Sequence, residues 1–97
     1  MTPEGVVKRD VSRLLSGYTP ELYFYMPVPS GFGKQGLDYI GCFRGHFFAI
    51  ETKAPGGKPT PRQYLTMRLM EKAGAKVFVT DGPLEEIEQW LNEIKRG

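Results

Sequence analysis

Two short apolar runs flanked by acidic residues constrain the fold of this chain more than any other feature. Residues 39–43 and 46–50 are apolar runs separated only by Arg44-Gly45, and Asp38 and Glu51 lie at their outer ends. A two-residue connection between such runs predicts a β-hairpin in which residues 43 and 46 pair. Counting outward from that pair places Asp38 directly opposite Glu51, with Cβ atoms roughly 4.5–5.5 Å apart.

The facing acids predict a metal site. Two carboxylates opposite each other repel unless a cation lies between them. Carboxylate and backbone carbonyl oxygens are the ligands that hard divalent cations such as Mg²⁺ prefer. Strand alternation places Lys53 on the same face as Glu51, whereas Thr52 offers that side only its backbone carbonyl. The alternative is that the charged side chains of Asp38, Glu51 and Lys53 form the solvated face of a hairpin.

The composition is that of a small folded domain. With 97 residues, 40% of them hydrophobic, and with six Phe and five Tyr, the chain is expected to be globular rather than disordered. A core of this size leaves little spare stability, which favours a homo-oligomer. We expect no membrane span and no signal peptide, because no apolar run is long enough. The single cysteine fits a reducing, cytoplasmic environment.

The remaining sequence predicts helices on both sides of a small mixed sheet. Capping and periodicity predict helices from Thr2 to Gly17, from Thr60 to about Ala73 and from Leu84 onward, and strands at Leu22–Val28 and 76–80. The resulting order α-β-β-β-α-β-α describes an α/β sandwich, and we expect one domain that spans residues 1–97.

Two polar residues in the predicted helices each have two readings. Glu4 lies at helical spacing before Val7 and Val11, so its carboxylate is expected on the core side, near the metal site. It also lies in a first helical turn, where an acid simply stabilises the helix dipole. Gln63 fits a capping box with Thr60. It is equally placed to point from the helix toward a scissile phosphate.

Several other side chains have simple expected roles. The loop cations Lys34, Lys58 and Arg62 frame the acid pair and are expected to contact a polyanionic substrate, although solvated loop charges are the default alternative. His46 is expected to be structural and Cys42 to be buried. The aromatic residues of the predicted strands are expected in the core rather than in stacking platforms: Tyr23, Phe24, Tyr25, Phe47 and Phe48. The apolar stripe of the last helix is also expected in the core, although it suits a dimer face as well: Leu84, Ile87, Leu91 and Ile94.

With these residues and this element order, the chain resembles the PD-(D/E)xK nuclease superfamily, and more narrowly the small stand-alone phage or bacterial form of the virus-type replication-repair nuclease (VRR-NUC) domain. The resemblance extends from Glu4 to the strand at 77–79. Asp38 matches the first acid of the motif, and Glu51-Thr52-Lys53 matches its E-x-K. Leu37 stands where the family pattern has proline.

The resemblance implies a restriction-endonuclease-like core and Mg²⁺- or Mn²⁺-dependent hydrolysis of DNA. Asp38, Glu51 and the Thr52 carbonyl would hold the metal, and Lys53 would orient a water or stabilise the transition state. Gln63 and Glu4 would be the helix residues of the active site. Stand-alone members resemble Holliday-junction resolvases that act as homodimers on branched DNA.

Other functions are compatible with the same residues. Within the nuclease class, the substrate could instead be a flap, a nick or a single strand. From other classes, the chain could be a catalytically silent DNA-binding module of the same fold, or an α/β protein unrelated to nucleic acids. The intact set of Asp38, Glu51 and Lys53 argues against the silent module.

Overall fold

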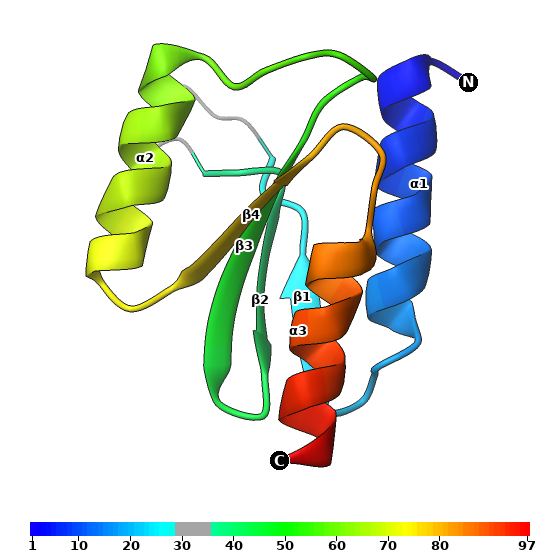
Figure 1. The fold of residues 1–97 in the computed structure, drawn as a ribbon, viewed down its shortest axis with the longest axis vertical. Helices are drawn as coiled ribbons and strands as arrows, with labels where there is room; N and C mark the ends of the chain where they lie inside the picture. Colours follow the sequence, from blue (N-terminus) through cyan, green and yellow to red (C-terminus); the bar gives the residue numbers. More distant parts are fainter. Residues whose placement is uncertain (29–35) are drawn as a thin grey trace.

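Helices lie on both sides of a four-stranded sheet in the computed structural model, which describes residues 1–28 and 36–97 (Figure 1). The elements are α1 (Pro3–Ser16), β1 (Leu22–Tyr25), β2 (Tyr39–Phe43), β3 (His46–Thr52), α2 (Pro61–Lys72), β4 (Lys76–Thr80) and α3 (Glu85–Arg96). The predicted order and the predicted α/β class are confirmed. Within the described ranges, no helix is both long enough and apolar enough to cross a membrane.

The hairpin of β2 and β3 has the predicted register. Its ladder begins with the antiparallel pair Phe43 and His46. The connecting residues Arg44 and Gly45 have φ angles of 49° and 85°. Positive φ at both central residues is the geometry of the tight turn that suits twisted antiparallel strands. The two-residue turn therefore fixes which residues face each other at the far end of the hairpin.

Strand β1 is shorter than the predicted Leu22–Val28. It pairs antiparallel with β2 and ends at Tyr25, opposite Ile40. Continuing that register would place Pro27 opposite Asp38, and proline has no amide hydrogen to donate to the ladder. The strand therefore ends before it reaches the position of Asp38.

Hydrophobic side chains pack on both faces of the sheet, whose order is β1-β2-β3-β4 with β4 parallel to β3. α1 and α3 lie on one face and α2 lies on the other (Figure 1). The larger core, on the α1 and α3 side, contains Val7, Val11, Leu15, Leu22, Tyr39, Phe43, Phe48, Ile50, Phe78, Ile87 and Leu91, with Phe24, Leu84 and Ile94 packed against it. The smaller core beneath α2 contains Leu37, Ala49 and Met67.

Four side chains that were predicted to be buried are exposed on the α2 side of the sheet. Tyr23, Tyr25 and Phe47 keep 72%, 52% and 45% of their surface exposed, and Cys42 is also exposed. Strand alternation turns all four away from the larger core. The prediction of burial is wrong for them because α2 packs over β4 and the smaller core and leaves the β1 side of this face open.

Gly41 in β2 allows a close approach between neighbouring strands. A Cβ at this position would lie 2.5 Å from Phe48 Cζ and 2.7 Å from the Tyr23 carbonyl oxygen. We expect Gly41→Ala to lower the free energy of unfolding by about 1–3 kcal/mol, because a well-packed core must shift to admit the methyl group. Urea denaturation measures the change. In Gly36→Ala the nearest atom would be at 3.4 Å, and equal losses in the two variants would contradict the crowding at Gly41.

Candidate active site

Thr52 holds Asp38 against the end of β3. The backbone amide and the hydroxyl of Thr52 both donate hydrogen bonds to Asp38 Oδ2, at 2.8 and 2.7 Å. Thr52 is buried, so the two bonds are shielded from water. Because Thr52 directly follows Glu51, this contact brings the two acids together as the hairpin register predicts. Sequence reasoning considered only the carbonyl of Thr52 and missed its hydroxyl.

Glu51 is a buried carboxylate beside another acid. Only 3% of its surface is exposed. Burial and the negative charge of Asp38 raise the pKa of Glu51, and they outweigh the opposing effects of Lys53 and of the Asp38 backbone. Perturbed carboxylates of this kind cluster at functional sites. Glu51 is therefore placed where a cation would stabilise its charged form.

Lys53 lies beside Glu51, as strand alternation predicts. Its Nζ is 3.3 Å from Glu51 Oε2, and its side chain is largely buried. Its backbone amide donates to the Thr80 carbonyl at 2.9 Å, which keeps the residue aligned with β4 after β3 ends. The ammonium group is therefore fixed next to the acid pair instead of extending into solvent.

Gln63 caps α2, as its first predicted reading states, and the same side chain also contacts Glu51. Its side-chain Oε1 accepts a hydrogen bond from the Thr60 backbone amide at 2.9 Å. The Gln63 backbone amide donates to Thr60 Oγ1, which completes the capping box of α2. Its Nε2 donates to Glu51 Oε2 at 3.0 Å. The first turn of α2 is therefore tied to the candidate site through the same amide that caps the helix.

Glu4 reaches the site indirectly, through Lys8. Its side chain is 43% exposed in the first turn of α1, so Glu4 does not share the full burial of Val7. Its carboxylate is 3.4 Å from Lys8 Nζ, which in turn is 3.9 Å from Asp38 Oδ1. Sequence reasoning did not predict Lys8 at the site. The available signal was its position one turn after Glu4, at i+4.

The donor atoms at the site suit a hard divalent cation. The described residues contain no group of three His, Cys, Asp or Glu side chains that could hold a metal. Asp38 and Glu51 nonetheless supply carboxylate oxygens from a like-charged, partly desolvated pair. Mg²⁺ typically uses one or two carboxylates and keeps several waters. The residues therefore fit such an ion, with Thr52 as the nearest source of a backbone carbonyl.

Superposition on a solved structure independently supports the fold. No family model matches the sequence, and no curated protein does. A solved structure described as a VRR_NUC domain superposes with a TM-score of 0.70 over 99% of this chain and 97% of that chain, at 21% sequence identity. The chain has the VRR_NUC fold.

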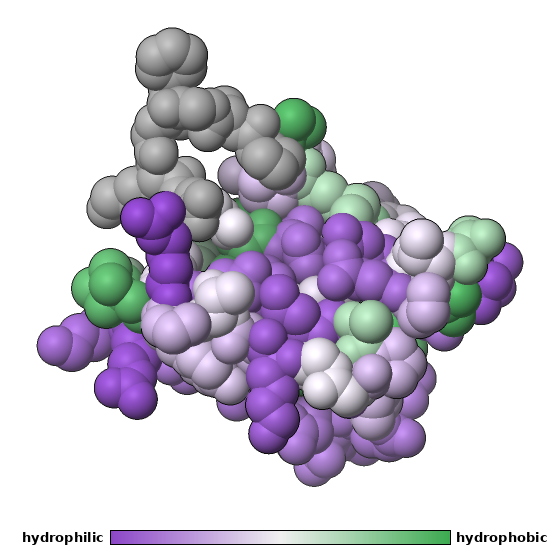
Figure 2. All heavy atoms as spheres, turned by 90° about the horizontal axis from the view of Figure 1, so that it is seen from above, coloured by the Kyte–Doolittle hydropathy of each residue, from purple (hydrophilic) through white to green (hydrophobic). Residues whose placement is uncertain are grey.

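Two of the predicted substrate-contacting cations are exposed where β3 leads into α2. Lys58 and Arg62 are exposed, in the loop before α2 and in its first turn. The loop that carries Lys58 is anchored where the Gly56 amide donates to Asp81 Oδ2 at 2.9 Å. Lys34 lies outside the described residues. Hydrophilic residues dominate the view from above (Figure 2).

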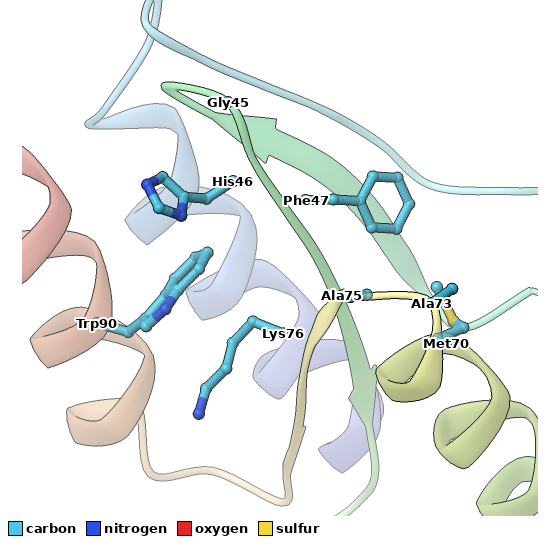
Figure 3. A pocket seen from close by; sticks show the side chains of 9 residues that line it. Gly45, His46, Phe47, Met70, Ala73, Ala75, Lys76 and Trp90 are labelled. Carbon is cyan, nitrogen blue, oxygen red and sulfur yellow. The ribbon is translucent and has the colours of Figure 1, made fainter.

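A pocket of about 630 Å³ lies at the opposite end of β3 (Figure 3). His46, Lys76 and Trp90 line it on one side of the sheet, and Phe47 and Met70 lie on the other. Its lining includes no carboxylate. Asp38 and Glu51 lie at the other end of the β2–β3 hairpin.

Proposed function

We propose that this chain is a metal-dependent endodeoxyribonuclease that hydrolyses phosphodiester bonds. The observation that carries the proposal is the fixed group of Asp38, Glu51 and Lys53 at the end of the hairpin, in which the buried Glu51 lies beside a half-buried acid and a largely buried lysine. The fold match to a structure described as a VRR_NUC domain supports it. DNA is the substrate that this fold favours.

The proposed cofactor is Mg²⁺ or Mn²⁺. Asp38, Glu51 and the backbone carbonyl of Thr52 would hold the ion, and water would complete its coordination. When bound, such a cation stabilises negative charge on the phosphate and lowers the pKa of a coordinated water. The raised pKa of Glu51 in the metal-free protein is consistent with a site that is completed by positive charge.

Lys53, Gln63 and Glu4 would position the reacting groups and stabilise charge at the site. Lys53, held 3.3 Å from Glu51 Oε2, would orient the attacking water or stabilise charge that develops on the phosphate. Gln63 orients Glu51 through its hydrogen bond, and the same bond holds the start of α2 beside the site. Glu4 acts through Lys8, which compensates the charge of Asp38.

The proposed substrate is branched DNA, in the manner of a Holliday-junction resolvase. Lys58, Arg62 and Lys34 would bind the phosphate backbone, which gives affinity without sequence preference. A homodimer would present two active sites to the two strands of a branch. The small size of the chain supports this arrangement, because one copy offers little surface for more than one DNA arm.

A cleavage assay tests the proposed function. Labelled four-way junction, flap, nicked, single-stranded and linear duplex DNA are incubated with the protein in Mg²⁺, Mn²⁺ or EDTA. We expect cleavage only with metal and fastest on the junction. A preference for flaps, nicks or single strands would support the alternative nuclease specificity. Binding without cleavage of any substrate would instead indicate a silent DNA-binding module and would contradict the proposal.

Thr52→Val separates the hydroxyl of Thr52 from its backbone. The valine keeps the shape and the carbonyl but removes the 2.7 Å hydrogen bond to Asp38 Oδ2. We expect metal affinity to fall by about 10–100-fold, the usual cost of losing a group that orients a metal ligand. Isothermal titration with Mn²⁺ measures it. Thr66→Val, which removes a hydroxyl bonded to the Arg62 carbonyl within α2, is the matched control, and equal affinities in the two variants would contradict the role of Thr52.

A further inference from the structure

A groove runs between α2 and the open part of the sheet. It has a volume of about 770 Å³, within the range of about 300–1,000 Å³ that is usual for ligand sites. We call it the α2 groove, and the side chains that matter for its chemistry are Tyr25, Ile40, Phe47, Arg62, Leu69 and Met70. Phe47 and Met70, which lie on the same side of the sheet in Figure 3, line both this groove and the pocket at the far end of β3.

The α2 groove lies on the same face of the sheet as Glu51. Strand alternation places Phe47 and Glu51 on the same face of β3. Tyr25 and Ile40 lie opposite each other, two residues before the level of Asp38, or about 6.6–6.8 Å along the strands. Arg62 directly precedes Gln63, which contacts Glu51. A chain that enters at the acids and follows the sheet therefore passes into the groove.

The lining of the groove combines aromatic rings with a single cation. Tyr25 and Phe47 are about half exposed on the open face, and Arg62 is the only charged residue among the described residues that line it. The positive charge is therefore at the end nearest the acids, and the apolar surface is farther along. This order suits a ligand whose anionic backbone enters first and whose flat apolar groups follow, as nucleobases stack on aromatic side chains in single-strand binding proteins.

We propose that the α2 groove binds unpaired nucleotides of the DNA strand whose phosphate enters the active site. The inference rests on the proposed nuclease function and specifies its substrate as DNA with a single-stranded segment next to the scissile bond. Branch points and flaps expose such nucleotides, whereas a continuous duplex keeps its bases stacked. Arg62 contacts the backbone, and Tyr25 and Phe47 stack on bases.

A second copy of the chain is the other occupant that such an apolar face suits. The cation at one end and the position on the same sheet face as Glu51 favour a strand of nucleic acid instead, because an interface between copies requires neither feature. The two occupants predict different effects of the same variants, so one set of measurements decides between them.

The test measures DNA binding in EDTA, where no cleavage occurs. Fluorescence anisotropy compares a labelled oligothymidine with a labelled blunt duplex for the wild type, Tyr25→Leu and Phe47→Leu. Leucine keeps apolar surface but removes the ring. We expect each variant to bind the single strand about 5- to 100-fold more weakly, with less than about a twofold change for the duplex. Tyr64→Leu, an exposed tyrosine of α2 outside the groove, should leave both affinities unchanged.

The remaining outcomes are also decisive. Unchanged single-strand affinity in both variants, or equal losses of affinity for single strand and duplex, contradicts the binding of unpaired nucleotides in the α2 groove, even if the wild type cleaves DNA. Sedimentation of each protein detects a second copy, since a dimer that dissociates in Tyr25→Leu marks this face as an interface and also overturns the inference. Ring-dependent binding of single strands by a protein that cleaves nothing with metal supports the groove and contradicts only the proposed nuclease function.

Discussion

Replacing Lys53 with alanine is expected to lower the rate of DNA cleavage by about 10²–10³-fold, the usual cost of removing one preorganised group that stabilises a transition state. The ammonium group lies 3.3 Å from Glu51 Oε2 and is largely buried, so water would replace its charge poorly. Single-turnover cleavage at saturating protein measures the loss in the chemical step.

The matched control for this prediction is Lys58→Ala. Lys58 is an exposed loop lysine, so its loss should weaken DNA binding and reduce the salt dependence of affinity while leaving the single-turnover rate within about twofold. If Lys53→Ala cleaved at the rate of Lys58→Ala, Lys53 would have no role in the chemical step.

Replacing Glu51 with glutamine is expected to have the largest effect on activity and an opposite effect on stability. Loss of a carboxylate proposed to hold the metal should reduce cleavage by about 10³-fold or more, because metal-ion stabilisation of the transition state contributes several kcal/mol. In EDTA the same variant should melt at a higher temperature than the wild type near neutral pH. Burial and the charge of Asp38 disfavour the ionised Glu51, and glutamine removes that charge.

The pH dependence of this stability gain follows from the raised pKa of Glu51. Since the folded-state pKa lies above the unfolded value, the native wild type holds an extra proton between the two pKa values. Its stability therefore falls as pH rises through that window, and the full penalty is present above the folded-state pKa. The advantage of Glu51→Gln should be smallest in acid and level off above the raised pKa.

Thermal unfolding in EDTA across a pH series measures the difference in melting temperature. Glu71→Gln, at an exposed position of α2, controls for the general removal of one negative charge. A wild type that is more stable than Glu51→Gln at neutral pH, or a difference that grows toward acid pH, would contradict the electrostatic account of Glu51.

The hairpin could be predicted because local rules determine it. A two-residue turn fixes the register, and the register together with strand alternation fixes which side chains share a face. These rules were sufficient to bring Asp38, Glu51 and Lys53 together. The capping box of Gln63 was equally local, and its second bond to Glu51 followed from the start of α2 lying near the end of β3.

The remaining features depend on tertiary placement, which local patterns do not encode. Alternation assigns Tyr25 and Phe47 to a face, but how much of that face α2 covers is set by the packing of the helix against β4. The contact of Lys8 with Asp38 depends on how α1 lies across the sheet. The early end of β1 was the exception, since Pro27 was visible in the sequence.

Crystals of the wild type grown with Mn²⁺ and measured at the manganese absorption edge test the central claim most directly. The proposed site predicts an anomalous peak bound by carboxylate oxygens of Asp38 and Glu51, and no such peak in Asp38→Asn crystals prepared in the same way. Absence of a peak between Asp38 and Glu51 at saturating Mn²⁺, or a peak coordinated only by other residues, would contradict the metal-dependent active site.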